Sequence, residues 1–149
     1  MFARSYYGFE AGSERGVSMP TLYRGNHLVI QYQHASGYVR VVRTETPFES
    51  ITDVAAALDA CRAALADLDL ALHGILFDWR RSPISTDPNL HKALAERMDA
   101  LADAFDRRAI LLATPVGTMQ ASRVGRAMGN QKMQVFNDED AAVKYVTYP

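Results

Sequence analysis

The chain has 149 residues, of which 48% are hydrophobic and 22% are charged, a balance that is ordinary for one globular domain. The formal net charge of −1 gives no electrostatic reason to expect nucleic acid or an anionic membrane as a partner. No apolar run approaches the roughly 20 residues that span a membrane, and the single cysteine, Cys61, excludes a disulfide within one chain, which fits a reducing cytoplasm.

The first nineteen residues differ from the rest of the sequence. Residues 1–19 mix glycine, serine and arginine without periodicity, as a loose N-terminal arm does. They also contain four aromatic side chains, which disordered tails seldom carry: Phe2, Tyr6, Tyr7 and Phe9. Three interpretations stay open: a disordered arm, a segment that docks on the domain or on a second subunit, and a stretch that precedes a true start at Met19. Residues 20–149 are predicted to form a single domain.

Three antiparallel strands are predicted next. Residues 21–24 and 27–32 are typical of the first two strands, because Gly25 and Asn26 between them tolerate positive φ and suit a tight turn. A second turn separates them from a third strand at 38–43.

The period then changes to that of a helix. Apolar residues recur at intervals of three and four, which predicts one buried helical face: Ile51, Val54, Leu58, Cys61, Leu65 and Leu68. Ser50 is the expected N-cap, and Asp53 suits the first turn. A thiol on this apolar face is expected to be buried and inert.

A strand at 74–79 and a second helix follow. Pro88 directly after Asp87 predicts the start of this helix, since proline suits the first helical position. The apolar face of this helix is predicted to consist of Leu90, Leu94, Met98, Leu101 and Phe105.

The last third of the chain alternates again. The apolar strand at 109–113 is expected to be buried and central, and a weaker helix at 116–128 follows it. After a strand at 133–136, Asn137 is predicted to cap a last helix. Its inward face would contain Ala142, Val143 and Val146. The order βββ-α-β-α-β-α-β-α predicts an α/β fold with a mixed sheet of about six strands and about four helices.

The most polar loop lies between the strand at 74–79 and its helix. Loops at the carboxyl ends of strands are where open α/β sheets usually bind other molecules. The candidate partner-binding residues are Asp78, Trp79, Arg80, Arg81, Ser82, Ser85, Thr86 and Asp87. Trp79 is interpreted either as a packing residue or, if exposed, as a hot spot for a partner.

Three stretches carry a family resemblance: GILFDWRRSPISTDPNL at 74–90, RRAILLATP at 107–115 and MQVFNDEDAAVKYV at 133–146. Together with the element order, they resemble a STAS domain of the SpoIIAA-like type, over about residues 21–148. The family comprises bacterial anti-sigma-factor antagonists and cytoplasmic domains of sulfate transporters. The resemblance implies a cytoplasmic protein-interaction module without a cofactor, and not an enzyme.

The resemblance also implies control by phosphorylation. In antagonist-type STAS domains a partner kinase phosphorylates a Ser or Thr at the start of the helix after this loop, and this switches protein binding. In this sequence Asp87 stands near the usual phosphoserine, and Pro88 stands where a second small residue is expected. Asp87 is therefore either a permanent charge or a helix N-cap. The remaining phosphorylation candidates are Ser82, Ser85 and Thr86, and the expected partner is a kinase or an anti-sigma-like regulator.

An anion site is a second interpretation of the strand ends. The backbone N–H groups between the strand at 109–113 and the next helix can bind an anion, together with nearby side chains. Its candidates are Thr114, Gly117, Thr118 and Arg123. Arg80, Arg81, Arg123 and Arg126 can converge on a phosphate or a carboxylate. The alternative is a solvated loop and a charged helix face, and no phosphate-binding glycine motif supports catalysis.

A response-regulator receiver also places an acid where Asp78 stands and a hydroxyl residue where Thr114 stands. A receiver needs an acidic pair after its first strand to hold Mg²⁺, and residues 30–34 contain no acid. Its lysine should follow the last strand, whereas Lys132 precedes that strand. These departures argue against a receiver.

No metal site and no catalytic nucleophile are predicted. The histidines lack metal-ligand spacing: His27, His34, His73 and His91. The loop hydroxyl groups have no His–Asp pair that the sequence places nearby. Two other functions remain as alternatives: binding of a small hydrophobic ligand or lipid between sheet and helices, and self-assembly as a homo-oligomer through an exposed sheet edge or the aromatic arm.

Overall fold

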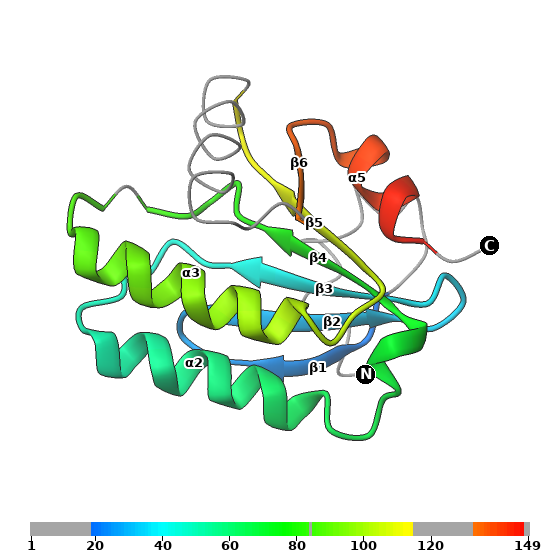
Figure 1. The fold of residues 1–149 in the computed structure, drawn as a ribbon, viewed down its shortest axis with the longest axis horizontal. Coiled ribbons are helices and arrows are strands. Elements are labelled where there is room, and N and C mark those ends of the chain that lie inside the picture. Colours follow the sequence, from blue (N-terminus) through cyan, green and yellow to red (C-terminus); the bar gives the residue numbers. More distant parts are fainter. Residues whose placement is uncertain (1–18, 84, 115–132, 148–149) are drawn as a thin grey trace.

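The computed structural model describes residues 19–83, 85–114 and 133–147, and these contain one mixed six-stranded sheet with three α-helices. The strands follow the chain order across the sheet, from β1 to β6 (Figure 1). The strands are β1 (Thr21–Arg24), β2 (Leu28–Gln33), β3 (Tyr38–Arg43), β4 (Gly74–Asp78), β5 (Arg107–Leu111) and β6 (Gln134–Phe136). The helices are α2 (Ile51–Ala64), α3 (Pro88–Ala102) and α5 (Glu139–Val146), with a short 3-10 turn, η2 (Leu70–Leu72).

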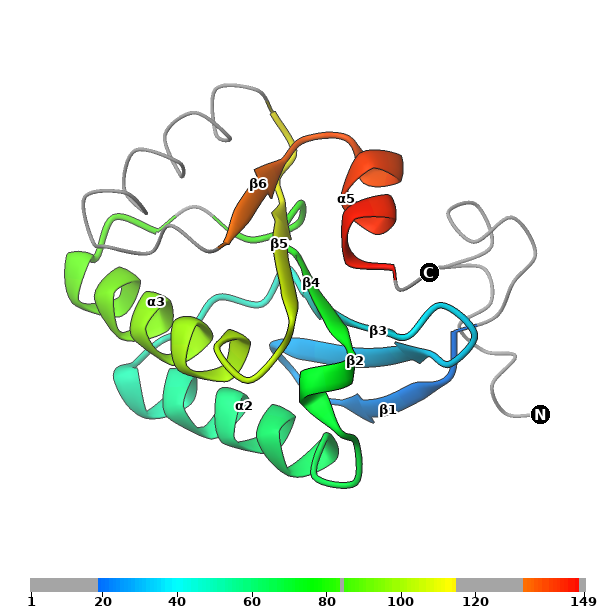
Figure 2. The same cartoon turned by 45° about the vertical axis from the view of Figure 1, so that its right-hand side comes forward.

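The predicted α/β class and the six strands are confirmed. Strands β1, β2 and β3 pair antiparallel, and β3, β4, β5 and β6 pair parallel. Helices α2 and α3 cover one face of the sheet, and α5 lies against the other face over β4 and β5 (Figures 1 and 2). The predicted helix at 116–128 lies outside the described residues.

The alternation of side chains along β4 divides the interior in two. Ile75 and Phe77 face α2 and α3, where they join the larger apolar cluster with Leu58 and Leu101. Leu76 points the other way and packs with residues beneath α5. That smaller cluster consists of Met19, Tyr38, Leu76, Ala109, Leu111, Ala142 and Val146. Asp78 continues the side of Leu76, so its carboxylate lies on the α5 face of the sheet.

The first turn differs from the prediction. Three residues, Gly25 to His27, connect β1 and β2, and the N–H of Gly25 donates to the carbonyl of Leu28 at 2.9 Å. Thr44, the residue that follows β3, holds this turn, since its Oγ1 donates to the carbonyl of Asn26 at 2.6 Å. Among the described glycines, positive φ occurs at Gly37, in the β2–β3 turn. A contact with the neighbouring strand therefore replaces the expected two-residue turn.

The helix caps are confirmed at two helices and corrected at the third. Ser50 accepts from the N–H of Asp53 at 3.2 Å, and Asp87 accepts from the N–H of Asn89 at 2.9 Å. The last helix is capped by Asp138, not by Asn137, because the Asp138 carboxylate accepts from the N–H of Ala141 at 3.1 Å. A carboxylate is also favoured by the partial positive charge at a helix N-terminus.

Two boundaries and one apolar face also need correction. Ile51, in the first turn of α2, is 53% exposed and lies outside the core. Strand β5 begins at Arg107, two residues before the predicted start, and Arg108 satisfies its charge by donating to the carbonyl of Ala102 at 2.7 Å. Met19, which the sequence assigned to the arm, is fully buried beside Tyr38, so the domain includes it. The other arm residues lie outside the described part of the chain.

Candidate functional site

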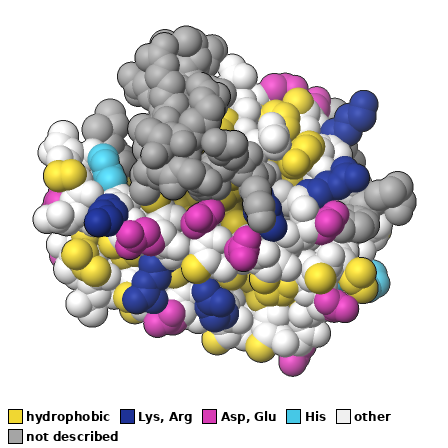
Figure 3. Space-filling view, viewed as in Figure 1, with side chains coloured by type: hydrophobic (Ala, Val, Ile, Leu, Met, Phe, Trp, Pro, Cys, Tyr) yellow, Lys and Arg dark blue, Asp and Glu magenta, His cyan; other side chains and the backbone are white. Residues whose placement is uncertain are grey.

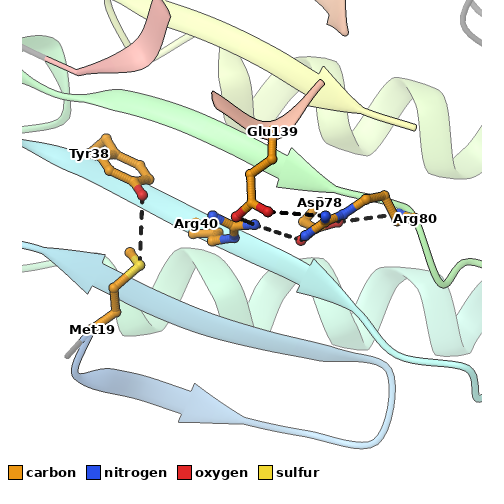
Figure 4. A network of polar contacts seen from close by, with 6 residues as sticks. All are labelled: Met19, Tyr38, Arg40, Asp78, Arg80 and Glu139. Carbon is orange, nitrogen blue, oxygen red and sulfur yellow. Dashed lines mark hydrogen bonds and ion pairs between the residues drawn. The ribbon is translucent and has the colours of Figure 1, made fainter. Parts of the chain in front are cut away.

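Four charged side chains meet on the α5 side of the sheet (Figure 4). Arg40 lies in β3, Asp78 ends β4, Arg80 follows two residues later, and Glu139 begins α5. We call these four residues the ion quartet. Both arginines contact both acids, so the quartet joins two central strands, the loop after β4 and the last helix.

The contacts of the quartet are short. Nη2 of Arg40 lies 2.9 Å from Oδ2 of Asp78 and 2.8 Å from Oε2 of Glu139. The guanidinium of Arg80 donates two hydrogen bonds to Asp78, from Nε to Oδ1 at 2.9 Å and from Nη2 to Oδ2 at 2.7 Å. Its Nη1 lies 3.1 Å from Oε1 of Glu139. The two-pronged Arg80–Asp78 contact is the geometry in which an arginine–carboxylate pair is strongest.

Local sequence places each member of the quartet. Arg40 pairs with Leu76 across the sheet, and Val42 pairs with Asp78, so Arg40 and Asp78 lie on one face at diagonal positions. Glu139 enters from α5 because Asp138 caps that helix and starts it at this point. Arg80 is turned back toward Asp78, whose Oδ1 also accepts from the Arg80 backbone N–H at 3.3 Å.

The quartet spans a gradient of burial with a balanced charge. The side chains of Arg40 and Asp78 are 3% and 7% exposed, whereas those of Glu139 and Arg80 are 21% and 37% exposed. Burial alone would raise the pKa of Asp78, but the hydrogen bonds of Arg80 and the nearby charge of Arg40 hold that pKa below its usual range. Burial alone would lower the pKa of Arg40, and Asp78 and Glu139 outweigh it and raise that pKa.

These pKa directions limit what Asp78 can do. Its carboxylate is ionised at neutral pH, and two guanidinium groups occupy it. Such a carboxylate is a poor proton acceptor. A receiver needs a reactive phosphoacceptor at this position, whereas the carboxylate of Asp78 is enclosed by two arginines. The contacts suit Asp78 to a positioning role, in which it fixes the start of the loop.

The β4–α3 loop, residues 79–83 and 85–87, begins with a tight turn. The N–H of Ser82 donates to the carbonyl of Trp79 at 3.1 Å, so Arg80 and Arg81 occupy the centre of a β-turn. The loop ends where Asp87 caps α3, and Oγ of Ser85 accepts from the N–H of Asp87 at 3.3 Å. The loop is therefore held by side chains at both ends, and the N-cap interpretation of Asp87 is confirmed.

The loop residues fall into buried and exposed groups. Trp79 is buried and meets the ring of Phe77 edge-on, with 5.3 Å between ring centroids, so the packing interpretation is confirmed and an exposed Trp hot spot is excluded. Ser82 is half-buried. The exposed residues are Arg80, Arg81, Ser85, Thr86 and Asp87. A partner approaching this loop would meet cationic, hydroxyl and acidic side chains.

The predicted anion site is tested only in part. Thr114 is exposed just after β5, whereas Gly117, Thr118, Arg123 and Arg126 lie outside the described residues. Arg80 is held by Asp78 and Glu139. The quartet thus gives Arg80 carboxylate partners within the protein.

Sequence reasoning found two members of the quartet and missed the other two. Asp78 and Arg80 stand out because they share the polar loop. Arg40 had a readable signal, since an arginine between two valines in a strand needs a carboxylate if the strand is central. That its partners are Asp78 and Glu139 follows only from the topology.

Cys61 and His73 lie outside the ion quartet, and their contacts indicate packing and structural roles. Cys61 is buried, and burial raises the pKa of its thiol to about 12, as expected for an inert packing residue. Nδ1 of His73 donates to the carbonyl of Asp69 at 2.6 Å, and its Nε2 lies 2.9 Å from Oη of Tyr32. Across residues 19–83, 85–114 and 133–147, no three His, Cys, Asp or Glu side chains are grouped as metal ligands.

Arg43 is a second buried cation, at the end of β3 on the α2 side. Its Nη1 donates to the carbonyls of His27, Thr44 and Thr46, and its guanidinium lies 4.2 Å from the Phe48 ring centroid. Burial lowers its pKa to about 10, so it stays protonated at neutral pH. These contacts hold the segment that leads into α2.

On the side of α2 and α3, the surface formed by the described residues carries charges of both signs. Acidic and basic side chains alternate over this face (Figure 3), and Arg97 of α3 pairs with Asp59 of α2 at 3.2 Å. None of the helices in the described part of the chain is both long enough and apolar enough to cross a membrane.

Comparison with known proteins provides no relative. The chain matches no protein-family model, and neither a curated protein nor a solved structure is significantly similar to it. Function must therefore be argued from the loop and the quartet themselves.

Proposed function

We propose that this protein is a non-enzymatic interaction module of the STAS type that works in the bacterial cytoplasm. Its partner is a protein, a kinase or an anti-sigma-like regulator, and it binds the β4–α3 loop. The element order and the position of this loop support the proposal. The proposed module uses no cofactor.

One observation carries the proposal: the loop is held at both ends and exposed in the middle. At its start, Arg80 is bonded to Asp78, and at its end Asp87 caps α3. The exposed hydroxyl groups of Ser85 and Thr86 lie between these two supports. A loop ordered before binding loses less conformational entropy when a partner docks.

The same position suits phosphorylation. Ser85 and Thr86 precede Asp87, the N-cap of α3, which begins at Pro88. A phosphate there adds about −1.5 to −2 charges beside the positive end of the helix. The modification would change the sign of the charge that a partner meets on this loop.

The test is the double variant Ser85→Ala/Thr86→Ala. The affinity for the captured partner should fall at least about tenfold, which corresponds to a loss of roughly 1.4 kcal/mol of binding. Kinase labelling in a lysate should fall to what Ser82 alone carries. Ser36→Ala is the matched control, since this serine lies in the β2–β3 turn at the other end of the strands. Unchanged labelling and unchanged affinity in the double variant would show that these hydroxyl groups are not the switch.

Self-assembly is a second candidate, favoured by one observation at the sheet edge. Among the described strands β1 pairs only with β2, and Leu22 in β1 is 41% exposed. Light scattering that shows a monomer at high concentration would exclude it. A hydrophobic ligand has no comparable support, because the side chains of the two described apolar clusters are packed against one another.

A further inference from the structure

Arg80 differs from Arg40 in where it lies, although both bind the same two carboxylates. Arg40 is fully enclosed between β3 and α5, whereas Arg80 belongs to the loop and is more than one-third exposed. Each carboxylate of the quartet therefore has one buried arginine and one arginine that solvent can reach.

This arrangement makes Arg80 removable. If Arg80 turns away, Arg40 still contacts Asp78 at 2.9 Å and Glu139 at 2.8 Å. Neither acid is left without a cation, and the less buried Glu139 gains access to water. Removing Arg40 instead would leave Asp78 in the interior with only the loop arginine, which is the more unfavourable state.

Ser82 lies close to Arg80 in the chain and in space. Both belong to the β-turn closed by the bond from the N–H of Ser82 to the carbonyl of Trp79. Two residues span at most about 7 Å between Cα atoms, which is within reach of an arginine side chain. Ser82 is half-buried, and its Oγ lies 3.5 Å from the Pro83 carbonyl, a weak contact that a modification can replace.

We propose that a phosphoryl group on Ser82 takes Arg80 out of the ion quartet and so loosens the start of α5. This inference rests on the proposed function, because a partner kinase must supply the group. Ser82 Oγ forms the new O–P bond to the γ-phosphorus of a nucleoside triphosphate. The bond to the leaving nucleoside diphosphate breaks, and the hydroxyl proton passes to a base of the kinase. A phosphate binds arginine in the same two-pronged way as a carboxylate and with more charge.

The consequence falls on α5 because Glu139 is its first residue. Arg80 provides one of the two arginine contacts to that residue, at 3.1 Å. The later part of α5 stays attached through the buried side chains of Ala142 and Val146. Phosphorylation therefore loosens the first turn of the helix, which Arg40 and the Asp138 cap still hold, and leaves its C-terminal half in place. A modification of the β4–α3 loop would in this way also change the surface formed by the start of α5.

The experiment uses full-length protein with phosphoserine installed genetically at position 82. Hydrogen exchange of the α5 amides is compared with that of unmodified protein, in the wild-type and Arg80→Gln backgrounds. Phosphate on Ser82 should speed exchange in the first turns of α5 about threefold or more, and Arg80→Gln alone should do the same. Adding phosphate to Arg80→Gln should change α5 no further.

Two controls separate this route from a general effect of charge or of arginine removal. Phosphoserine at Ser36 adds the same charge in the β2–β3 turn, and Arg97→Gln breaks the surface pair with Asp59. Both should leave exchange in α5 unchanged. Equal exchange in α5 with and without phosphate on Ser82, or an equal phosphate effect in Arg80→Gln, would overturn the coupling.

The coupling and the proposed function fail in different ways. If a partner distinguishes the phosphorylated protein while α5 does not respond, the interaction module stands and the coupling is wrong. If α5 responds while no partner binds the loop in either form, the coupling through Arg80 is correct and the proposed function is wrong.

Discussion

At the scale of single residues, the protein uses two arginines for one pair of acids and gives them different surroundings. Arg40 is buried by β3 and α5, and Arg80 is on the loop. A buried charge that loses its partner is strongly destabilising, while a partly exposed pair contributes little because solvent screens it. The two arginines should therefore differ sharply in their effect on stability.

Replacing Arg40 with methionine is predicted to lower the free energy of unfolding by about 3–5 kcal/mol, since it breaks a buried ion pair. Arg80→Gln should lower it by no more than about 1 kcal/mol, because that side chain is screened by water. Urea unfolding measures both, with Arg97→Gln as a surface control expected within about 0.5 kcal/mol of wild type. Equal losses for Arg40→Met and Arg80→Gln would show that burial does not separate their roles.

Single residues also show how far the sequence could predict the site. Asp78 and Arg80 were identifiable because they are neighbours in one polar loop. Glu139 was not, since it is 99 residues from Arg40 and no local pattern links them. The pairing of these residues depends on the order of strands in the sheet, which hydrophobic periodicity alone does not determine.

At the scale of elements, the apolar periodicity of the sequence predicted where helices lie, but it did not predict every boundary. Helices α2 and α3 were predicted with their caps because apolar spacing and capping residues agree there. The start of β5 was missed, since Arg107 and Arg108 are polar in sequence and satisfied in the structure by the carbonyls of Tyr145 and Ala102. The prediction for the first turn was wrong because Thr44, which follows β3, shapes this turn through a hydrogen bond to Asn26.

The contact of α5 with the sheet depends on a glycine at the start of β4. A Cβ at Gly74 would collide with the backbone and Cβ of Val146, near the C-terminus of α5. Gly74→Ala should lower the free energy of unfolding by about 1–3 kcal/mol, the range for overfilling a packed site.

Gly25→Ala is the matched control for this prediction. Its Cβ would meet only the outer part of the Tyr23 side chain, which can rotate away, so the loss should stay below about 1 kcal/mol. Thermal or urea unfolding of both variants makes the comparison. A Gly74→Ala protein as stable as wild type would mean that α5 does not approach β4 as closely as described.

At the scale of the whole molecule, the parallel strands of the sheet end on the same side, and the β4–α3 loop and Asp78 lie at this side. Strands β4 and β5 run side by side, so Asp78 and Leu111 are paired where both strands end. The β4–α3 loop begins at this edge, and the quartet connects the loop to α5 on the opposite side from α2 and α3. The architecture therefore places the proposed binding loop and the last helix in one electrostatic unit.

The central claim is that the β4–α3 loop is the surface that a partner protein touches, and site-specific photocrosslinking tests it most directly. A photoreactive residue replaces Arg81 in the loop, or Arg62 on the exposed side of α2 as a control, in cells that express the protein. The account predicts a discrete protein adduct from position 81 and none from position 62. No adduct from position 81, or the same adducts from both positions, would contradict it.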